Sequence, residues 1–188
     1  MLDDLKFIHE RDAHDALGSA ERHWGVDVWS SVVPTARNQA KQIALEVIGK
    51  TPIIYSSEFL APAAEHWKRG FNLHAKHLAW TGQFPEFLET ELTGWSKQPV
   101  HKPFAVIELR SELDYPETQA AYDLAERALS GKRPAPNKVY VQGDNEPAQI
   151  LWASALGDFV TIYTALLNGV NPTSRPFADK IHQLREQQ

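Results

Sequence analysis

The chain contains no cysteine among its 188 residues. A chain without cysteine can have no disulfide framework, no thiolate zinc site and no cysteine nucleophile. It also lacks the HExxH metal motif, so His66, His74 and His77 are interpreted as surface or hydrogen-bonded histidines and no metal site is expected. A reducing compartment suits this composition but is not demanded by it.

Basic runs and long apolar runs are also missing. The formal net charge is −5 and no arginine-rich stretch occurs, so nucleic acid is not an expected partner. The acidic first twelve residues do not follow the pattern of a signal peptide. The most apolar segment, 150–167, contains Asp158 and falls short of a good membrane span. These absences predict a cytoplasmic protein without a membrane partner.

Glycine-rich phosphate loops are absent as well. No dinucleotide fingerprint follows the first apolar run, and the chain has no GxxxxGK[ST] sequence. Nucleotide cofactors are therefore not indicated, and we expect no cofactor of any kind. The composition itself, 43% hydrophobic and 23% charged, is that of an ordinary globular protein.

The stretch 51–95 predicts a strand–helix–strand unit. Residues 51–55 form a short β-branched run typical of a buried strand. Ser56, Ser57 and Glu58 follow as a polar turn, Pro62 suits a helix start, and Gly70 suits a helix end. A second strand is expected at 77–81. Hydroxyls at the carboxyl end of a strand occupy the usual ligand position of open α/β sheets.

The remaining chain continues the alternation of helices and strands. We predict further strands at 104–109 and 138–142, and helices at 1–24, from Thr35 to Gly49, from Asp114 to Gly131, from Asn145 to Gly169 and at 177–185. Short apolar strands between helices indicate a parallel sheet covered on both faces, a three-layer α/β/α sandwich. The long helix that begins at Asn145 is apolar nearly all round, which is typical of a buried helix.

Several short motifs together resemble one family, the second sugar-isomerase (SIS) domain of bifunctional phosphoglucose/phosphomannose isomerases. The motifs are Asn38-x-Ala40-Lys41, Gly49-Lys50-Thr51-Pro52-Ile53-Ile54-Tyr55, Ala61-Pro62-Ala63-Ala64, Asn72-x-x-Ala75-Lys76, Pro85-Glu86, Glu91, Gly94-Trp95, Leu156-Gly157-Asp158-Phe159-Val160 and Gly169-Val170-Asn171-Pro172-Thr173. The resemblance implies an SIS-type, flavodoxin-like domain over 36–188, preceded at 1–35 by a helical extension and connector.

The resemblance also implies a chemistry, from which this chain departs. Family members interconvert glucose 6-phosphate or mannose 6-phosphate with fructose 6-phosphate, using a glutamate base and a histidine that opens the sugar ring. Those positions are occupied here by Leu73 and Glu89. The family's late lysine falls near Lys180 or His182. Glu89, His182 and Lys180 are therefore the candidate catalytic residues.

Candidate contacts to a phosphorylated sugar come from two segments. Ser56 and Ser57 are candidates for the phosphate or a hydroxyl group, although a helix-entry cap would explain them equally well. Asn72, His74 and Lys76 border the altered base position, although Lys76 could equally pair with a neighbouring acid. Solvated carboxylates remain the alternative for the acidic run at 86–91, and core packing the alternative for Trp67, Trp80 and Trp95.

Two functions stay open on the sequence. The first is a divergent phosphosugar isomerase, and the second is a catalytically inactive sugar-phosphate-binding module with a regulatory or assembly role. We expect a phosphorylated sugar as ligand and a homodimer as the assembly. A first SIS domain, upstream or on another chain, is a further possible partner because family members carry two such domains.

Overall fold

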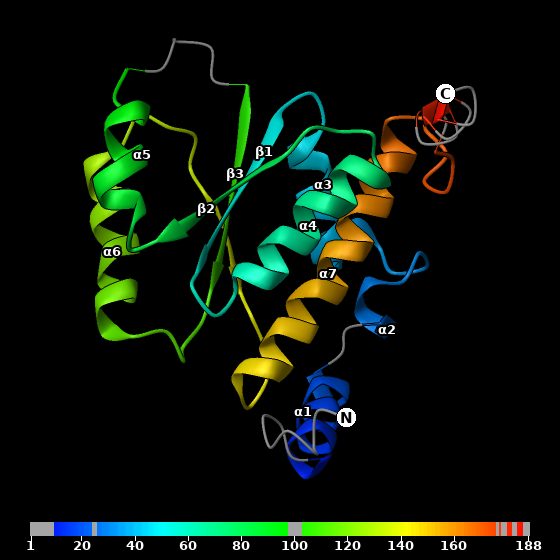
Figure 1. Ribbon diagram of the computed structural model, residues 1–188, viewed down its shortest axis with the longest axis horizontal. Coiled ribbons are helices and arrows are strands. Elements are labelled where there is room, and N and C mark those ends of the chain that lie inside the picture. Colours follow the sequence, from blue (N-terminus) through cyan, green and yellow to red (C-terminus); the bar gives the residue numbers. More distant parts are fainter. Residues whose placement is uncertain are drawn as a thin grey trace.

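A parallel sheet of four strands forms the middle layer of the protein in a computed structural model (Figure 1). The structure describes residues 10–23, 26–97, 103–175, 177, 180, 181, 184 and 185. The strands are β1 Thr51–Ser57, β2 Trp80–Phe84, β3 Phe104–Arg110 and β4 Asn137–Tyr140. They lie in the order β2–β1–β3–β4, so the winding reverses between β1 and β3.

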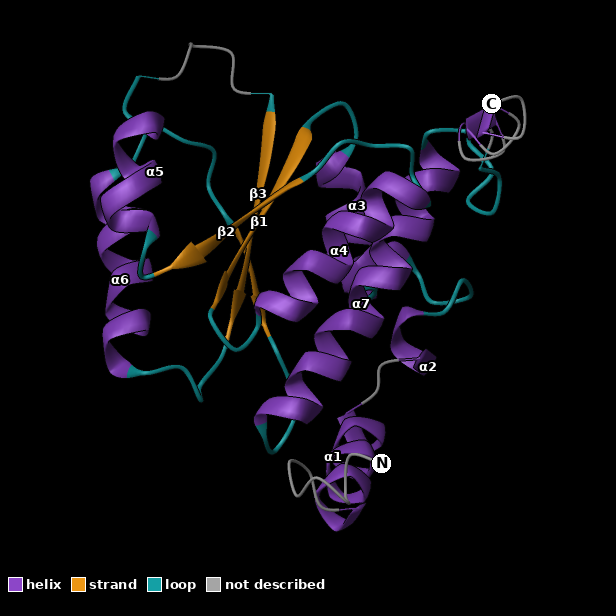
Figure 2. Ribbon diagram, viewed as in Figure 1, coloured by secondary structure: helices purple, strands orange, loops and turns teal. Residues whose placement is uncertain are grey.

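Helices cover both faces of this sheet, as Figure 2 shows. One face carries α3 Gln39–Val47, α4 Ala61–Leu73 and α7 Glu146–Leu167, and the other carries α5 Phe87–Trp95 and α6 Pro116–Ala128. Two further helices, α1 Glu10–His23 and α2 Val26–Trp29, and a 3₁₀ turn at Thr35–Arg37 precede α3. The predicted three-layer α/β/α sandwich is confirmed.

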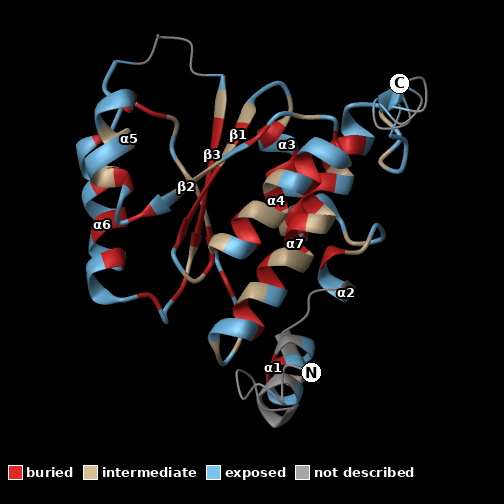
Figure 3. Ribbon diagram, viewed as in Figure 1, coloured by how far each residue is buried: buried red, intermediate tan, exposed pale blue. Residues whose placement is uncertain are grey.

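Side chains alternate along the central strands to fill the two cores. Ile54 of β1 and Ile107 of β3 join the core under α3, α4 and α7. Their neighbours Tyr55 and Val106 point to the opposite face and join the core under α5 and α6. Both faces are thus buried (Figure 3), which explains why these strands are continuous apolar runs in the sequence.

The long helix α7 packs on the face of the sheet that also carries α3 and α4. By length and composition it could cross a membrane, so the expectation that this segment falls short of a membrane span is wrong on that measure. In the structure it contacts α1, α3 and α4 and buries Trp152, Leu156 and Val160. The predicted cap at its start is also present, because Asn145 Oδ1 accepts a hydrogen bond of 2.9 Å from the Ala148 amide.

The start of the first core helix differs from the prediction. Thr35 begins a 3₁₀ turn instead of capping a long helix, and α3 starts after Asn38. The Asn38 side chain accepts from the Lys41 amide at 3.1 Å and donates to the carbonyl oxygens of Trp29 and Ser30 at 2.9 and 3.1 Å. This buried amide fixes the helix start, so the prediction that the helix begins at Thr35 is wrong. The connector also contains the short helix α2, which was not predicted.

The segment from α4 to β2 differs in a similar way. Gly70 does not end α4, which continues to Leu73. A Cβ atom at Gly70 would lie 2.9 Å from the Thr161 side chain, so glycine is needed there for the close approach of α7. The second strand begins at Trp80 instead of 77, because the His77 amide donates to the Phe71 carbonyl oxygen in a turn after the helix.

Candidate functional site

Two serines lie buried at the carboxyl end of β1, where the sheet reverses its winding. Ser56 is fully buried and Ser57 is 4% exposed. Within the described part of the chain neither hydroxyl makes a hydrogen bond. Buried hydroxyls are usually paired, so each unpaired one marks a place where a water molecule or a ligand hydroxyl would be stabilised. Consecutive strand residues point to opposite faces of the sheet, so the two hydroxyls of β1 lie in different places.

Polar groups that follow β3 face the same edge of the sheet. Ser111 Oγ donates to Gln149 Oε1 at 2.5 Å, and the Ser111 amide donates to Asp114 Oδ2 at 3.0 Å. The other oxygen of Asp114 has no hydrogen-bond partner among the described residues. Burial raises the pKa of the Asp114 carboxyl, and the Ser111 amide opposes that rise. Ser57 opposes it too by proximity, although its hydroxyl falls short of hydrogen-bond geometry.

A second group of predicted residues lies at the far end of α4. Asn72 donates to the Lys68 carbonyl oxygen at 2.8 Å, and His74 Nδ1 lies 3.0 Å from Thr161 Oγ1. Lys76 Nζ donates to the Leu73 carbonyl oxygen at 2.6 Å, where a cation favours the negative end of the helix. Lys76 thus caps the C-terminal end of α4. The sequence analysis had instead considered a neighbouring acid or a ligand as the partner of Lys76.

Asn72 and Lys76, but not His74, border a pocket of about 480 Å³ between α4 and the C-terminal segment. It is lined by Asn72, Leu73, Lys76, Leu78, Ser174, Arg175 and Phe177. The pocket therefore lies at the position where the resemblance puts the catalytic base. Its described lining contains two cationic side chains and no carboxylate, so it suits an anion and offers no proton acceptor of ordinary basicity.

Arg175 was missed by the sequence analysis. It is exposed, and within the described residues it makes no ion pair. The available signal was its position two residues after the Asn171-Pro172-Thr173 motif, near the C-terminal segment that the resemblance connects with the site. Nothing local indicates that Arg175 should lie beside Leu73, because the two residues are far apart in the chain.

The predicted acid/base residues are placed elsewhere. Glu89 is exposed in the first turn of α5, on the opposite face of the sheet from α4. Lys180 is exposed in the C-terminal segment, and His182 lies outside the described residues. The structure therefore does not bring Glu89 together with the residues around Leu73 in one chain.

The two groups of predicted ligand contacts are also separated. Ser56 and Ser57 precede α4, whereas Asn72, His74 and Lys76 lie at or beyond its end. A helix rises ~1.5 Å per residue, so the 13 residues of α4 put about 18 Å between its ends. A hexose phosphate cannot span that distance, so within one chain the two groups belong to different sites.

Comparison with known proteins gives a consistent family. Residues 36–187 match the pattern of the bacterial phospho-glucose isomerase C-terminal SIS domain. The bifunctional phosphoglucose/phosphomannose isomerase of Aquifex aeolicus is 26% identical over 147 residues, which cover 78% of this chain and 46% of the relative. That of Caldicellulosiruptor bescii is 29% identical over 144 residues, covering 75% and 42%. The chain spans about half the length of these curated relatives.

Solved structures with the same fold agree. A glucose-6-phosphate isomerase-like protein from Thermus thermophilus superposes with a TM-score of 0.73 and 25% identity, over 86% of this chain and 55% of that one. A hypothetical protein from the same organism superposes with a TM-score of 0.71 over 94% of this chain and 49% of its own. Its identity of 12% shows likeness of fold alone.

Proposed function

The chain belongs to the bacterial phospho-glucose isomerase C-terminal SIS domain family, and from this premise we propose that it binds phosphorylated sugars in the pocket at the end of α4. The proposal rests on one observation: Lys76 and Arg175 line one pocket together with Leu73, the residue that the resemblance aligns with the family's base. Among its described lining residues the pocket offers two cationic side chains for a phosphate and no carboxylate of the kind that isomerisation needs.

Arg175 and Lys76 would each contact a bound phosphate in a different way. The guanidinium of Arg175 can form two parallel hydrogen bonds to phosphate oxygens. Lys76 is held in place by the Leu73 carbonyl oxygen and adds charge at close range. The apolar side chains of Leu73 and Leu78 can cover the carbon face of the sugar ring, whereas neither can move a proton between adjacent carbons.

Titration calorimetry with glucose 6-phosphate, mannose 6-phosphate, fructose 6-phosphate and inorganic phosphate tests this proposal. We expect saturable binding of at least one sugar phosphate. The Arg175→Gln variant should bind about 10- to 100-fold more weakly, because a charge-assisted hydrogen bond contributes ~1.5–3 kcal/mol. Arg69→Gln is the matched control, since Arg69 is an exposed cation on α4 outside the pocket lining. Equal loss in both variants would contradict a specific site.

A coupled assay that converts glucose 6-phosphate to fructose 6-phosphate separates binding from catalysis. Loss of a general base costs about 10²- to 10⁴-fold in rate, so we expect little turnover by this chain. The Leu73→Glu variant puts a carboxylate back into the pocket and should raise any residual activity while binding stays similar. Turnover at an ordinary enzyme rate by the unaltered chain would contradict the inactive-module proposal.

The second candidate function is isomerisation with Glu89 as the acid or base. Its support is that Glu89 is an exposed carboxylate with no ion pair among the described residues. Because Glu89 and Leu73 lie on opposite faces of the sheet, this function requires a second chain or an upstream SIS half to complete the site. A homodimer whose activity is abolished by Glu89→Gln would favour this candidate.

The assembly that this second function needs is itself a proposal. Exposed apolar side chains near the end of α7, Leu166 and Leu167, together with Leu45 of α3, offer a surface for a second subunit. Light scattering at micromolar concentration would give twice the chain mass for a homodimer. A monomeric mass would leave a separate SIS half as the partner to be sought. A cytoplasmic location likewise stays a prediction.

A further inference from the structure

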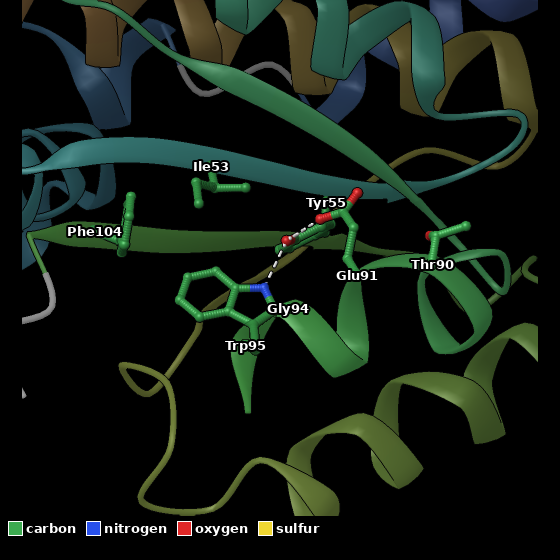
Figure 4. Close-up of a pocket in the computed structure, with 7 residues that line it drawn as sticks. All are labelled: Ile53, Tyr55, Thr90, Glu91, Gly94, Trp95 and Phe104. Carbon is green, nitrogen blue, oxygen red and sulfur yellow. Dashed lines mark hydrogen bonds between the residues drawn. The ribbon is translucent and has the colours of Figure 1, made fainter. Parts of the chain in front are cut away.

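A separate pocket lies on the other face of the sheet, behind α5. Its volume is about 370 Å³, and it is lined by Ile53, Tyr55, Thr90, Glu91, Gly94, Trp95 and Phe104. Figure 4 shows these side chains around the space between α5 and the strands β1 and β3. None of the residues proposed to bind sugar phosphate lines it. Its walls are aromatic and aliphatic, and its one charged side chain is the Glu91 carboxylate.

Hydrogen bonds within the lining use up its side-chain donors. Tyr55 Oη donates to Glu91 Oε2 at 2.5 Å, and Trp95 Nε1 donates to Tyr55 Oη at 2.9 Å (Figure 4). The hydroxyl of Thr90 donates to the Glu86 carbonyl oxygen at 3.0 Å. No other side chain of the lining has an N–H or O–H group. What remains for a ligand is acceptor capacity, mainly the second oxygen of Glu91.

The charge of the pocket also favours a ligand that donates hydrogen bonds over an anion. Glu91 makes no ion pair within the described part of the chain, and the lining contains no lysine or arginine. A phosphate or carboxylate would meet a negative charge and no free side-chain donor, so anionic ligands are disfavoured. An organic cation would instead supply donors to Glu91 and place its apolar part against aromatic walls.

Gly94 leaves space at the rim of this pocket. It is the second-to-last residue of α5 and is exposed. A Cβ atom there would meet no atom of the described residues within 4 Å. A larger residue at this position would border the pocket and reduce its volume.

From these observations we propose that the pocket behind α5 binds a small organic cation, an ammonium or guanidinium group on an apolar body. The carboxylate of Glu91 holds the charged group, and Trp95, Phe104 and Ile53 enclose the apolar part. Tyr55 positions Glu91 through its hydrogen bond, so the carboxylate is fixed before the ligand arrives. This site is independent of the sugar-phosphate pocket at the end of α4.

Titration of the indole N–H signal of Trp95 in the intact chain tests the proposal. The probes are benzylammonium, benzyl alcohol and benzoate, which share a ring and differ in charge. The signal is assigned with Trp95→Phe. A probe of this size binds in the millimolar range at ordinary ligand efficiency. We expect a saturable shift with benzylammonium and none with benzoate. Equal shifts with all three probes, or none with benzylammonium, would overturn the proposal.

Three variants sharpen the test. Glu91→Gln keeps an oxygen that can accept from Tyr55 but removes the charge, and should weaken benzylammonium at least about tenfold. Gly94→Leu has room for its Cβ atom and brings a larger side chain to the pocket, so it should abolish the shift while the melting curve stays cooperative. Glu117→Gln, at an exposed carboxylate of α6 outside the pocket lining, is the matched control and should bind as the unaltered chain does. Binding that survives both Glu91→Gln and Gly94→Leu would place the cation elsewhere and refute the assignment.

Discussion

Trp67 of α4 and Gly157 of α7 touch so closely that a side chain at position 157 has no room. A Cβ atom built on Gly157 would lie 2.4 Å from the indole atoms Cδ1 and Nε1 of Trp67. The indole N–H also donates to the Ala153 carbonyl oxygen at 2.7 Å, one helical turn before Gly157. The fully buried Trp67 therefore fixes how α4 and α7 cross.

The substitution Gly157→Ala should destabilise the fold for this reason. Overpacking a filled core typically costs ~1–3 kcal/mol, which outweighs the gain in helix propensity of about 1 kcal/mol. Urea unfolding measures the difference. Gly94→Ala is the matched control, because a Cβ atom there meets nothing within 4 Å, and it should stabilise. Equal effects of the two substitutions would contradict the close contact.

Removal of Glu108 should be among the most damaging changes in the chain. This fully buried carboxylate bonds Arg110 at 2.6 Å and Arg133 at 2.5 Å, and the Arg133 side chain is 2% exposed. Glu108→Ala leaves the buried Arg133 without an ion pair among the described residues, whereas Arg110 keeps Asp123 at 3.3 Å. Leaving one buried charge unpaired costs roughly 3–5 kcal/mol. Glu126→Ala, which breaks a half-exposed pair with Lys138, should cost about 1 kcal/mol or less. Chemical denaturation of both variants compares them directly.

Asn38→Ala should loosen the connector as well as α3. It removes a helix cap, typically worth ~1 kcal/mol, and two hydrogen bonds to the carbonyl oxygens of Trp29 and Ser30. We expect a total loss of roughly 2–3 kcal/mol. Limited proteolysis should show faster cleavage between 30 and 34. Asn72→Ala serves as control, because its amide bonds one exposed carbonyl and its loss should leave cleavage unchanged.

The buried carboxyl of Asp114 predicts a dependence of stability on pH. Burial raises its pKa in the folded state, so the folded protein holds this proton more tightly than the unfolded chain does. Its contribution to stability is fully present below the unfolded pKa and is lost as the pH rises through the folded pKa. Asp114→Asn should remove this loss.

Unfolding free energies measured in urea from acidic to neutral pH test that sign. The difference between Asp114→Asn and the unaltered chain should shift in favour of the variant as the pH rises. Asparagine can still accept from the Ser111 amide, so the hydrogen bond is retained in the comparison. A difference that stays constant with pH, or moves the other way, would contradict the raised pKa.

Much of the fold follows from local patterns in the sequence. Gly49 and Gly131 have positive φ angles of 72° and 71° and end helices where the sequence predicts a stop. Asn145 caps α7 as its position before an apolar run indicates. The predictions that failed involve partners distant in sequence. Asn38 sets the start of α3 in place of Thr35 because its side chain donates to the Trp29 carbonyl oxygen. Gly70 stays within α4 because the Thr161 side chain packs against it.

For the candidate site, too, local patterns predicted some features and tertiary packing decided the others. The sequence alone determined the number and parallel arrangement of the strands and the burial of one face of α7, because these depend on residue type and short spacing. Only the tertiary structure decided that Arg175 lies beside Leu73, that Glu89 lies across the sheet, and that Tyr55 holds Glu91. Those neighbours are set by helix packing against a sheet, which local periodicity does not encode.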